Sequence, residues 1–251
     1  MRELLTRVAG AVLRTALLAE ARCPCCGKVR AGGMAELCAE CREDGAAAEA
    51  EQRGEPCPGC GEYPPVPQDV SLLCGCCRET PRPWGRVLAY GPYAGRLKQL
   101  ILGYKFENRL DFGRSLQECL LEAYERGVAA CPELGQGAVL VPVPLHPRRL
   151  LMRGFNQSRE IARLLSARHG LPIRQDALSR VRRTTPQMRL AREARAENIR
   201  GAFAARSQVL EGQAVLLVDD IMTTGATLEE CARAMLAAGA KRVDVLVLAR
   251  A

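Results

Sequence analysis

Residues 215–228 carry side chains that could hold a sugar phosphate. An apolar run at 215–218 ends in two carboxylates, Asp219 and Asp220, and a turn rich in hydroxyl groups and glycine follows at 223–227, before a helical pattern begins. The N–H groups and the dipole at a helix N-terminus favour a phosphate, and carboxylates accept hydrogen bonds from sugar hydroxyls. The pattern predicts a strand that leads into an anion-binding turn, with the two acids beside it.

The cysteines form a second pattern with chemical meaning. Ten of the thirteen cysteines lie between positions 23 and 77, and eight of them form four Cys-x2-Cys pairs. The pairs are Cys23 with Cys26, Cys38 with Cys41, Cys57 with Cys60, and Cys74 with Cys77. Each pair lets two thiolates reach one metal from a tight turn, so two pairs supply the four ligands of a tetrahedral zinc ion. We expect two structural zinc ions.

The sequence leaves the grouping of the four pairs open. Sequential grouping is the simplest, with the first two pairs in one site and the last two in the other, but interleaved grouping uses the same ligands. Cys25 and Cys76 are left over, and Cys76 could replace Cys74 or Cys77 as a ligand. Redox-active Cys-x2-Cys pairs are the alternative chemistry, and four repeated pairs disfavour it.

The cysteine-rich region is too small to build a large apolar core, so we expect it to depend on metal for folding. Gly27 and Gly61 directly follow two of the pairs, where a turning backbone often needs a positive φ. The remaining cysteines, Cys119, Cys131 and Cys231, lie in helical or loop contexts and are expected to be buried or spare.

The positive charge of the chain is concentrated in one block. The net charge is +8; residues 1–83 carry 10 basic and 12 acidic side chains, whereas residues 141–200 alone carry 14 and 4. Such a block suits a polyanionic ligand, either a polyphosphate or a nucleic-acid backbone. The alternative is a solvated helix face rich in arginine. Aromatic content of 4% disfavours a protein that stacks bases along a single strand.

The chain divides into three regions. Residues 1–20 alternate apolar and charged side chains and predict an amphipathic helix, residues 21–80 form the double zinc-ribbon module, and residues 84–251 have an α/β pattern. Pro81-Arg82-Pro83 marks the boundary. Residues 43–54 could form a short linking helix within the module. The apolar runs are shorter than the ~20 residues needed to span a bilayer, and a cytoplasmic location is the default expectation.

Strands and helices alternate after residue 84. We expect strands at 86–90, 139–143, 214–218 and 243–249, and helices at 95–105, 110–126, 157–168 and 226–238. Leu164 is expected to face inward from the third helix and Leu236 from the last. Alternation of this kind predicts a largely parallel sheet flanked by helices, with ligands bound beyond the carboxyl ends of the strands. Asp219-Asp220 and the segment 146–149 both lie at such ends.

Several motifs together resemble a known family. Residues 218–227, Val-Asp-Asp-Ile-Met-Thr-Thr-Gly-Ala-Thr, resemble the phosphoribosyl pyrophosphate (PRPP) signature of type I phosphoribosyltransferases. Residues 141–149 and 153–157, the Thr184-x-Pro186-Gln187 motif and Arg195-x-x-Asn198 narrow the resemblance. With the cysteine pairs in front, residues 21–251 resemble the ComF family of competence-associated proteins. The fold implied is a type I phosphoribosyltransferase-like α/β domain behind a double zinc ribbon.

The resemblance implies a role for each part of the site. The 5′-phosphate would be bound by Thr223, Thr224, Gly225, Ala226 and Thr227. Asp219 and Asp220 would bind the ribose hydroxyls, directly or through magnesium. The pyrophosphate loop would comprise Leu145, His146, Arg148 and Arg149. A flexible loop from about residue 182 to 198 would close over the site and bring in Arg182, Arg183 or Arg192.

Each of these roles has a simpler structural alternative. Two aspartates after a strand can cap a helix, His146 can be a turn residue, and residues 182–200 can form a charged amphipathic helix. Thr223 stands where some purine-using relatives carry an acidic base, so purine salvage is disfavoured and the acceptor and catalytic residues are not identified.

Three functions are compatible with these observations. The ComF resemblance implies a PRPP-binding protein that acts in uptake of single-stranded DNA or in DNA repair, with a helicase-like ATPase as partner. A magnesium-dependent phosphoribosyltransferase with an unidentified acceptor is the second function. A PRPP sensor without turnover is the third.

Overall fold

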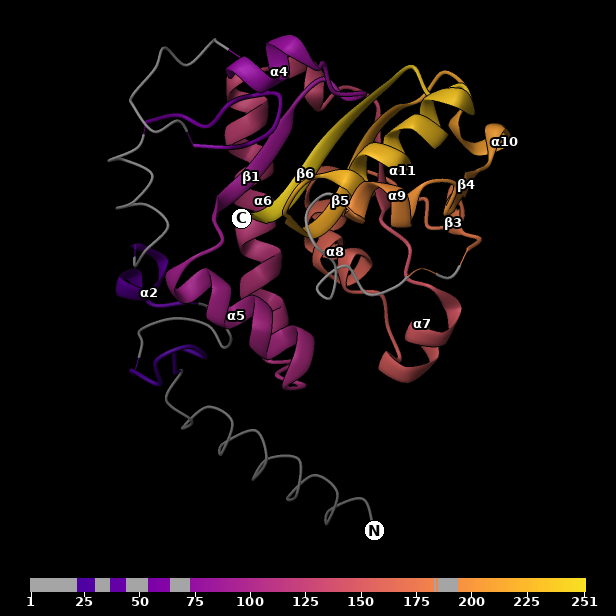
Figure 1. Ribbon diagram of the computed structural model, residues 1–251. Helices are drawn as coiled ribbons and strands as arrows, with labels where there is room; N and C mark the ends of the chain where they lie inside the picture. The colour runs from indigo at the N-terminus through magenta and orange to yellow at the C-terminus, as the bar shows by residue number, and fades with distance from the viewer. Residues whose placement is uncertain (1–21, 30–36, 44–53, 64–72, 183, 185–193) are drawn as a thin grey trace.

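A four-stranded parallel sheet forms the centre of the molecule. The computed structural model describes residues 22–29, 37–43, 54–63, 73–182, 184 and 194–251. The strands are β1 (Val87–Pro92), β2 (Ala138–Pro142), β5 (Ala214–Met222) and β6 (Arg242–Arg250), in the order β1-β6-β5-β2. Every pair in this sheet is parallel, which confirms the predicted parallel architecture (Figure 1).

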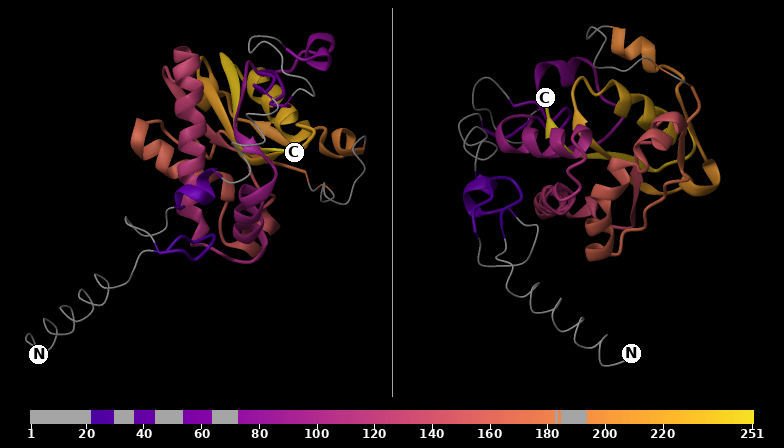
Figure 2. Two further views of the ribbon diagram at one scale, coloured as in Figure 1. Left: turned by 90° about the vertical axis from the view of Figure 1, so that its left-hand side faces the viewer. Right: turned by 90° about the horizontal axis from the view of Figure 1, so that it is seen from below.

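Helices cover both faces of the sheet. On one face α6 (Phe112–Ala130) packs on β1 and β6, α8 (Gln157–His169) packs on β2 and β5, and α5 (Gly95–Phe106) packs on α6. On the other face α11 (Ala226–Ala237) packs on β5 and β6, beside α9 (Ala194–Ile199) and the antiparallel pair β3 (Leu178–Arg180) and β4 (Phe203–Ala205). The two further views in Figure 2 show these layers on either side of the strands. Each face buries its own apolar cluster.

Short helices complete the described part of the chain. They are α2 (Ala39–Glu43), α4 (Gly75–Glu79), η1 (Pro132–Leu134), α7 (Pro147–Arg153) and α10 (Ser207–Leu210). None of the helices in the described ranges is long and apolar enough to cross a membrane. The amphipathic helix expected at residues 1–20, and nearly all of the one expected at 43–54, lie outside the described residues.

Two details of the sequence prediction need correction. Strand β5 does not end at Val218, because its pairing with β6 continues through Asp219 and Ile221 to Met222. Leu236 is 36% exposed, since α11 buries Leu228, Cys231, Ala232 and Met235, and position 236 lies roughly a quarter turn from the centre of that stripe. Leu164 is only partly buried. Cys119, Cys131 and Cys231 are buried, as expected.

Candidate functional site

A cavity of about 740 Å³ opens at the carboxyl ends of β2 and β5. The two strands are hydrogen-bonded neighbours, and the amide of Val143, just after the end of β2, donates to the carbonyl oxygen of Val218 in β5 at 2.9 Å. Segments far apart in the sequence line this cavity: the end of α5, the start of α7 and α8, Arg180, the acid pair and the turn before α11. The predicted location of the ligand site is thus a real cavity.

The turn before α11 has the geometry of an anion-binding turn. Gly225 has φ +81°, a conformation that favours glycine, and a Cβ at this position would lie 2.8 Å from Cε of Met222 and 3.3 Å from the ring of Trp84. Thr223, Gly225, Ala226 and Thr227 line the cavity, but Thr224 does not. The hydroxyl of Thr224 instead accepts the amide of Ala226 at 3.4 Å and helps to start α11.

The two carboxylates face different environments. Oδ1 of Asp219 accepts the Ser158 hydroxyl at 3.0 Å and the Asp220 amide at 2.9 Å. Burial, and then the negative charge of Asp220, raise the pKa of Asp219 to about 7. Asp220 forms an ion pair with Lys105, whose Nζ lies 2.7 Å from Oδ2. These two are the only acidic side chains among the described residues that line the cavity.

Three arginines also line the cavity. They are Arg149, Arg153 and Arg180. Burial lowers the pKa of Arg153 and of Arg180, and the positive charge of Arg149 lowers both further. Arg153 donates to the carbonyl oxygen of Lys105 at 3.0 Å. Because like charges converge here, the cavity favours an anionic ligand.

Buried donors point to the same conclusion. Nε2 of Gln157 and Nε of Arg180 are buried and have no hydrogen-bond partner among the residues that the structure describes. Gln157 is only 3% exposed, and both residues line the cavity. A buried donor without an acceptor is unfavourable, so a ligand with acceptor oxygens would satisfy these groups.

The segment expected to bind pyrophosphate is partly helical. Leu145 and Arg149 line the cavity, whereas His146 and Arg148 do not. His146 is the N-cap of α7, and its Nδ1 accepts the amide of Arg148 at 3.3 Å. The segment therefore presents Arg149 to the cavity and uses His146 to start the helix.

The segment expected to be a flexible loop shows a different arrangement where it is described. Arg182 lies outside the cavity and donates to the carbonyl oxygens of Asn198 at 2.9 Å and Arg200 at 2.6 Å. Residues Ala194–Ile199 form α9, so this part of the expected loop is helical. Arg183 and Arg192 lie outside the described residues.

Aromatic side chains also line the cavity and are here called the aromatic wall. It contains Tyr93, Tyr104, Phe106 and Phe155, and the rings of Tyr104 and Phe155 lie 5.6 Å apart. This wall was not predicted from the sequence, and neither were Lys105, Ser158 and Arg180. Arg153 and Gln157 belong to the motif at residues 153–157, and that motif was the sequence signal from which they could have been identified. The others are brought to the cavity only by the packing of the helices and β3.

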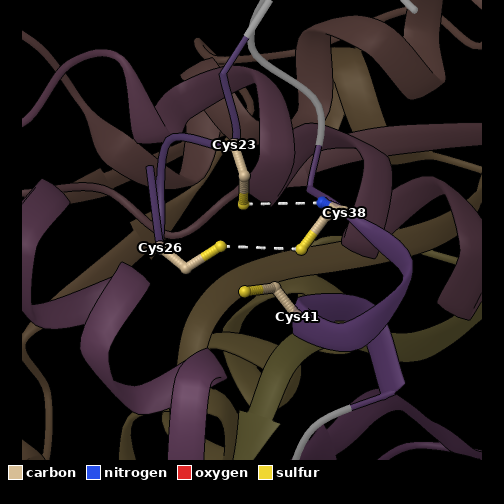
Figure 3. A group of neighbouring side chains, drawn as sticks. All are labelled: Cys23, Cys26, Cys38 and Cys41. Carbon is tan, nitrogen blue, oxygen red and sulfur yellow. Dashed lines mark hydrogen bonds between the residues drawn. The ribbon is translucent and has the colours of Figure 1, made fainter. Parts of the chain in front are cut away.

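The eight cysteines of the pairs form two groups of four in sequential order. The first four-cysteine group is Cys23, Cys26, Cys38 and Cys41, and the second is Cys57, Cys60, Cys74 and Cys77. Within each group all four sulfurs lie within 4.8 Å of one another, and Figure 3 shows those of the first group converging. Cys25 and Cys76 belong to neither group, and Cys76 is exposed.

The two four-cysteine groups have the same local structure. Gly27 and Gly61 have φ of +75° and +67°, and each donates its amide to the carbonyl oxygen of the first cysteine of its turn, at 2.8 and 2.7 Å. A backbone amide also donates to a sulfur in each group, Cys38 to Cys23 at 3.4 Å and Cys74 to Cys57 at 3.3 Å. Four converging thiols supported by N–H···S bonds fit a structural zinc ion.

The second four-cysteine group is joined to the turn at 223–227. The carbonyl oxygen of Gly59 accepts the indole N–H of Trp84 at 2.7 Å, and the Trp84 ring covers Gly225. The guanidinium of Arg250, which is 8% exposed, donates to the carbonyl oxygens of Cys60 at 2.8 Å and Met222 at 3.4 Å. A short chain of contacts therefore connects this group to Met222, just before the turn, and to Gly225 within it.

Comparison with known proteins shows which family the chain belongs to. Residues 150–251 match the Phosphoribosyl transferase domain family. The chain is 35% identical over 196 residues to the DNA utilization protein YhgH of Escherichia coli K12, which covers 77% of this chain and 83% of that protein. It is 31% identical to Competence protein F of Haemophilus influenzae, over 77% of this chain and 85% of that protein. The chain belongs to the ComF family.

Two further comparisons give lower sequence identities. Competence protein ComFC of Bacillus subtilis is 26% identical over 196 residues, which are 74% of this ComF chain and 73% of that protein. The crystal structure of TT1426 from Thermus thermophilus is 23% identical and covers 54% of this chain and 72% of that one, with a TM-score of 0.29. That score is too low to support any functional comparison.

Proposed function

We propose that this ComF protein binds PRPP or a related 5-phosphoribosyl compound, and that it acts in DNA uptake during competence or in DNA repair. One observation carries the ligand class: the turn at 223–227 and the acid pair Asp219-Asp220 open into the same cavity as three arginines. A helix N-terminus binds a phosphate, carboxylates bind sugar hydroxyls, and arginines bind further phosphate oxygens.

Each group has one role in this proposal. The turn binds the 5′-phosphate, and Asp219 and Asp220 bind the ribose hydroxyls. Leu145 and Arg149 bind the diphosphate, and Arg148 precedes Arg149 in α7. Magnesium accompanies the diphosphate, whose oxygens are ligands that this ion prefers. Closure of the segment that contains Arg182, Arg183 and Arg192 would require Arg182 to leave the carbonyl oxygens of Asn198 and Arg200.

The acid pair favours a free sugar phosphate over a DNA end in the cavity. In this proposal the 5′-phosphate lies in the turn, and Asp219 and Asp220, which line the same cavity, bind the 2′- and 3′-hydroxyls. The first nucleotide of a 5′-phosphorylated DNA strand has no 2′-hydroxyl, and its 3′-oxygen is esterified. We therefore assign DNA to those side chains of the basic block at residues 141–200 that do not line the cavity, and not to the cavity.

The role in DNA metabolism is supported by the relatives. Proteins named for DNA utilization and for competence share 31–35% identity with the chain. We propose single-stranded DNA and a helicase-like ATPase as partners, and a cytoplasmic location. We also propose that each four-cysteine group holds one structural zinc ion.

Phosphoribosyl transfer to an acceptor is a second candidate function. The aromatic wall formed by Tyr93, Tyr104, Phe106 and Phe155 favours it, because a flat acceptor could stack there opposite the ribose. No acidic side chain other than Asp219 and Asp220 lines the described cavity, and Thr223 cannot act as a base. This composition gives more support to binding than to turnover. Pyrophosphate release from PRPP in the presence of magnesium that depends on an added acceptor, with the phosphoribosyl group recovered on that acceptor, would establish transfer.

Calorimetric titration with PRPP tests the ligand site. The double substitution Asp219→Asn, Asp220→Asn should weaken PRPP binding at least about a hundredfold, because it removes both carboxylates from the ribose hydroxyls. Asp176→Asn is the matched control, since Asp176 is an exposed acid outside the cavity, 3.8 Å from Arg206. Circular dichroism checks the fold of both variants. Unchanged PRPP affinity in the double variant would remove the basis of the assignment.

Titration of single-stranded DNA into the same protein tests the second ligand. Affinity for DNA should fall by at least about tenfold between roughly 50 and 200 mM salt, since neutralised phosphates release counterions. The double variant should bind DNA as well as the native chain does. Loss of DNA binding in that variant would place the DNA in the cavity instead.

A further inference from the structure

Lys105 places a positive charge on the acid pair. It lies in the last turn of α5, and its Nζ lies 2.7 Å from Oδ2 of Asp220. The side chains are 23% and 13% exposed, so water screens this pair only weakly. Lys105 and both acids line the cavity, and the lysine reaches strand β5 from a helix on the other side of the opening.

Contacts of the backbone fix the position of Lys105. Its carbonyl oxygen accepts Nη2 of Arg153 at 3.0 Å, and the guanidinium of Arg153 lies 6.0 Å from the centre of the Phe106 ring. The end of α5 is thereby attached to the residue that ends α7. These contacts fix the backbone from which the Lys105 side chain extends to the acid pair, and the ion pair with Asp220 places its ammonium group there.

The acid pair does not fit a simple magnesium site. Magnesium prefers carboxylate oxygens and keeps several waters in octahedral geometry. Here Asp220 already has a cationic partner, and Oδ1 of Asp219 already accepts two hydrogen bonds. A divalent cation at these oxygens would have to displace the ammonium group or be repelled by it.

We propose that Lys105 is the resident cation of the acid pair, so that the ribose end of the ligand binds without a divalent metal ion. This inference rests on the proposed function and deepens it. An ammonium group has three donors, of which one faces Asp220 and the others can reach ribose oxygens. Magnesium, where it is used, then belongs to the diphosphate end of PRPP.

Ribose 5-phosphate is the probe that separates the two ends, because it has the ribose and the 5′-phosphate but no diphosphate. Its calorimetric affinity for the native protein should differ by less than about twofold with and without magnesium. Lys105→Met should weaken binding at least about tenfold without magnesium, and magnesium should restore most of that loss by taking the place of the ammonium group. Lys105→Arg should keep metal-independent binding.

Lys98→Met is the matched control. Lys98 lies on the same helix and is exposed, with its Nζ 5.6 Å from the centre of the Tyr93 ring. The variant removes one positive charge from α5 without touching the acid pair. Binding of ribose 5-phosphate should remain as in the native protein, with and without magnesium.

The possible outcomes distinguish the two proposals. Absence of ribose 5-phosphate binding by the native protein under both conditions would contradict the proposed function itself. Three results would overturn the role of Lys105 and leave the proposed function intact. They are native binding that needs magnesium, a Lys105→Met variant that binds like the native protein, and a failure of magnesium to rescue that variant. If Lys105→Met does not fold, the native protein decides, because an affinity that depends more than about tenfold on magnesium excludes a resident cation.

Discussion

The two four-cysteine groups share their ligands and local turns but differ in what surrounds them. In the first group, Cys23 and Cys41 belong to the apolar cluster that α5, α6 and α8 build on one face of the sheet. In the second group, Cys57, Cys60 and Cys77 form a small apolar cluster of their own. This second cluster is joined to the sheet through carbonyl oxygens of its turn, which accept the Val87 amide, the Trp84 indole and the Arg250 guanidinium.

We infer from this difference that two four-cysteine groups with the same local structure have different roles. Apolar contact is not directional, so the first group adds buried surface to the core and contributes to stability. Hydrogen bonds are directional, so the second group fixes the positions of Trp84 and Arg250, and through them Gly225 and Met222 on either side of Thr223 and Thr224. We infer that the second group positions the phosphate-binding turn and that the first does not.

The largest expected effect comes from removing one ligand from each group in turn. Cys60→Ser should weaken ribose 5-phosphate binding at least about tenfold, because loss of the zinc ion frees the turn that supports Trp84 and Arg250. Cys26→Ser should leave that affinity within about threefold of the native value. Zinc content, calorimetry and thermal unfolding of both variants check the comparison.

Cys26→Ser should instead lower the melting temperature. An equal loss of ribose 5-phosphate affinity in the two cysteine variants would show that both groups act only through global stability. It would then remove the distinction between them.

A smaller effect is expected from the arginines beside each group. Arg250→Met leaves the carbonyl oxygens of Cys60 and Met222 without this buried donor, and should lower the free energy of unfolding by about 2 kcal/mol. Arg109→Met is the counterpart beside the first group, where Nη2 of Arg109 donates to the carbonyl oxygen of Pro24 at 3.3 Å. Because Arg109 is exposed, its loss should change stability much less and leave ribose 5-phosphate binding unaltered. Urea unfolding and calorimetry measure both; matching losses would contradict the comparison.

The smallest effect is expected from Trp84→Phe. This variant keeps an aromatic ring beside Gly225 but removes the N–H that donates to Gly59, which should cost about 1 kcal/mol of stability and a few-fold in ribose 5-phosphate affinity. Tyr124→Phe removes a buried hydroxyl on the opposite face of the sheet and serves as the control. If the two variants bind ribose 5-phosphate equally well, the contact between Trp84 and Gly59 has no influence on the site.

The sequence was sufficient wherever the determining residues are close together in the chain. The acid pair and the turn at 223–227 form one strand–turn–helix unit, so their proximity follows from local geometry. The Cys-x2-Cys spacing predicted the eight cysteines of the two groups, although their sequential grouping was established only by the structure. The parallel sheet was predictable because buried strands and amphipathic helices alternate along residues 84–251.

The sequence was insufficient where tertiary packing brings distant residues together. Lys105 at the end of an amphipathic helix has the pattern of a solvated surface lysine, and only the position of α5 over the sheet brings it to Asp220. Arg180 lies in a strand of three residues, too short to show a periodic pattern. Arg182 has the chemistry of a phosphate ligand, yet its guanidinium donates to the carbonyl oxygens of Asn198 and Arg200. The second four-cysteine group was predicted as a structural site, but its connection to Gly225 runs through Trp84, far from the turn in sequence.

The pairing of β3 with β4 has a consequence for evolution of the segment between them. The ladder from Leu178–Ala205 to Arg180–Phe203 is extended by the amide of Val181, which donates to the carbonyl oxygen of Ala202 at 2.9 Å. The pairing of β3 with β4 therefore holds together the two ends of the chain segment between them. Doubling the length of a loop whose ends are already joined costs only about 0.6 kcal/mol. The pairing of β3 with β4 should therefore tolerate a change in the number of residues between positions 183 and 193, so selection can act on that number in related proteins.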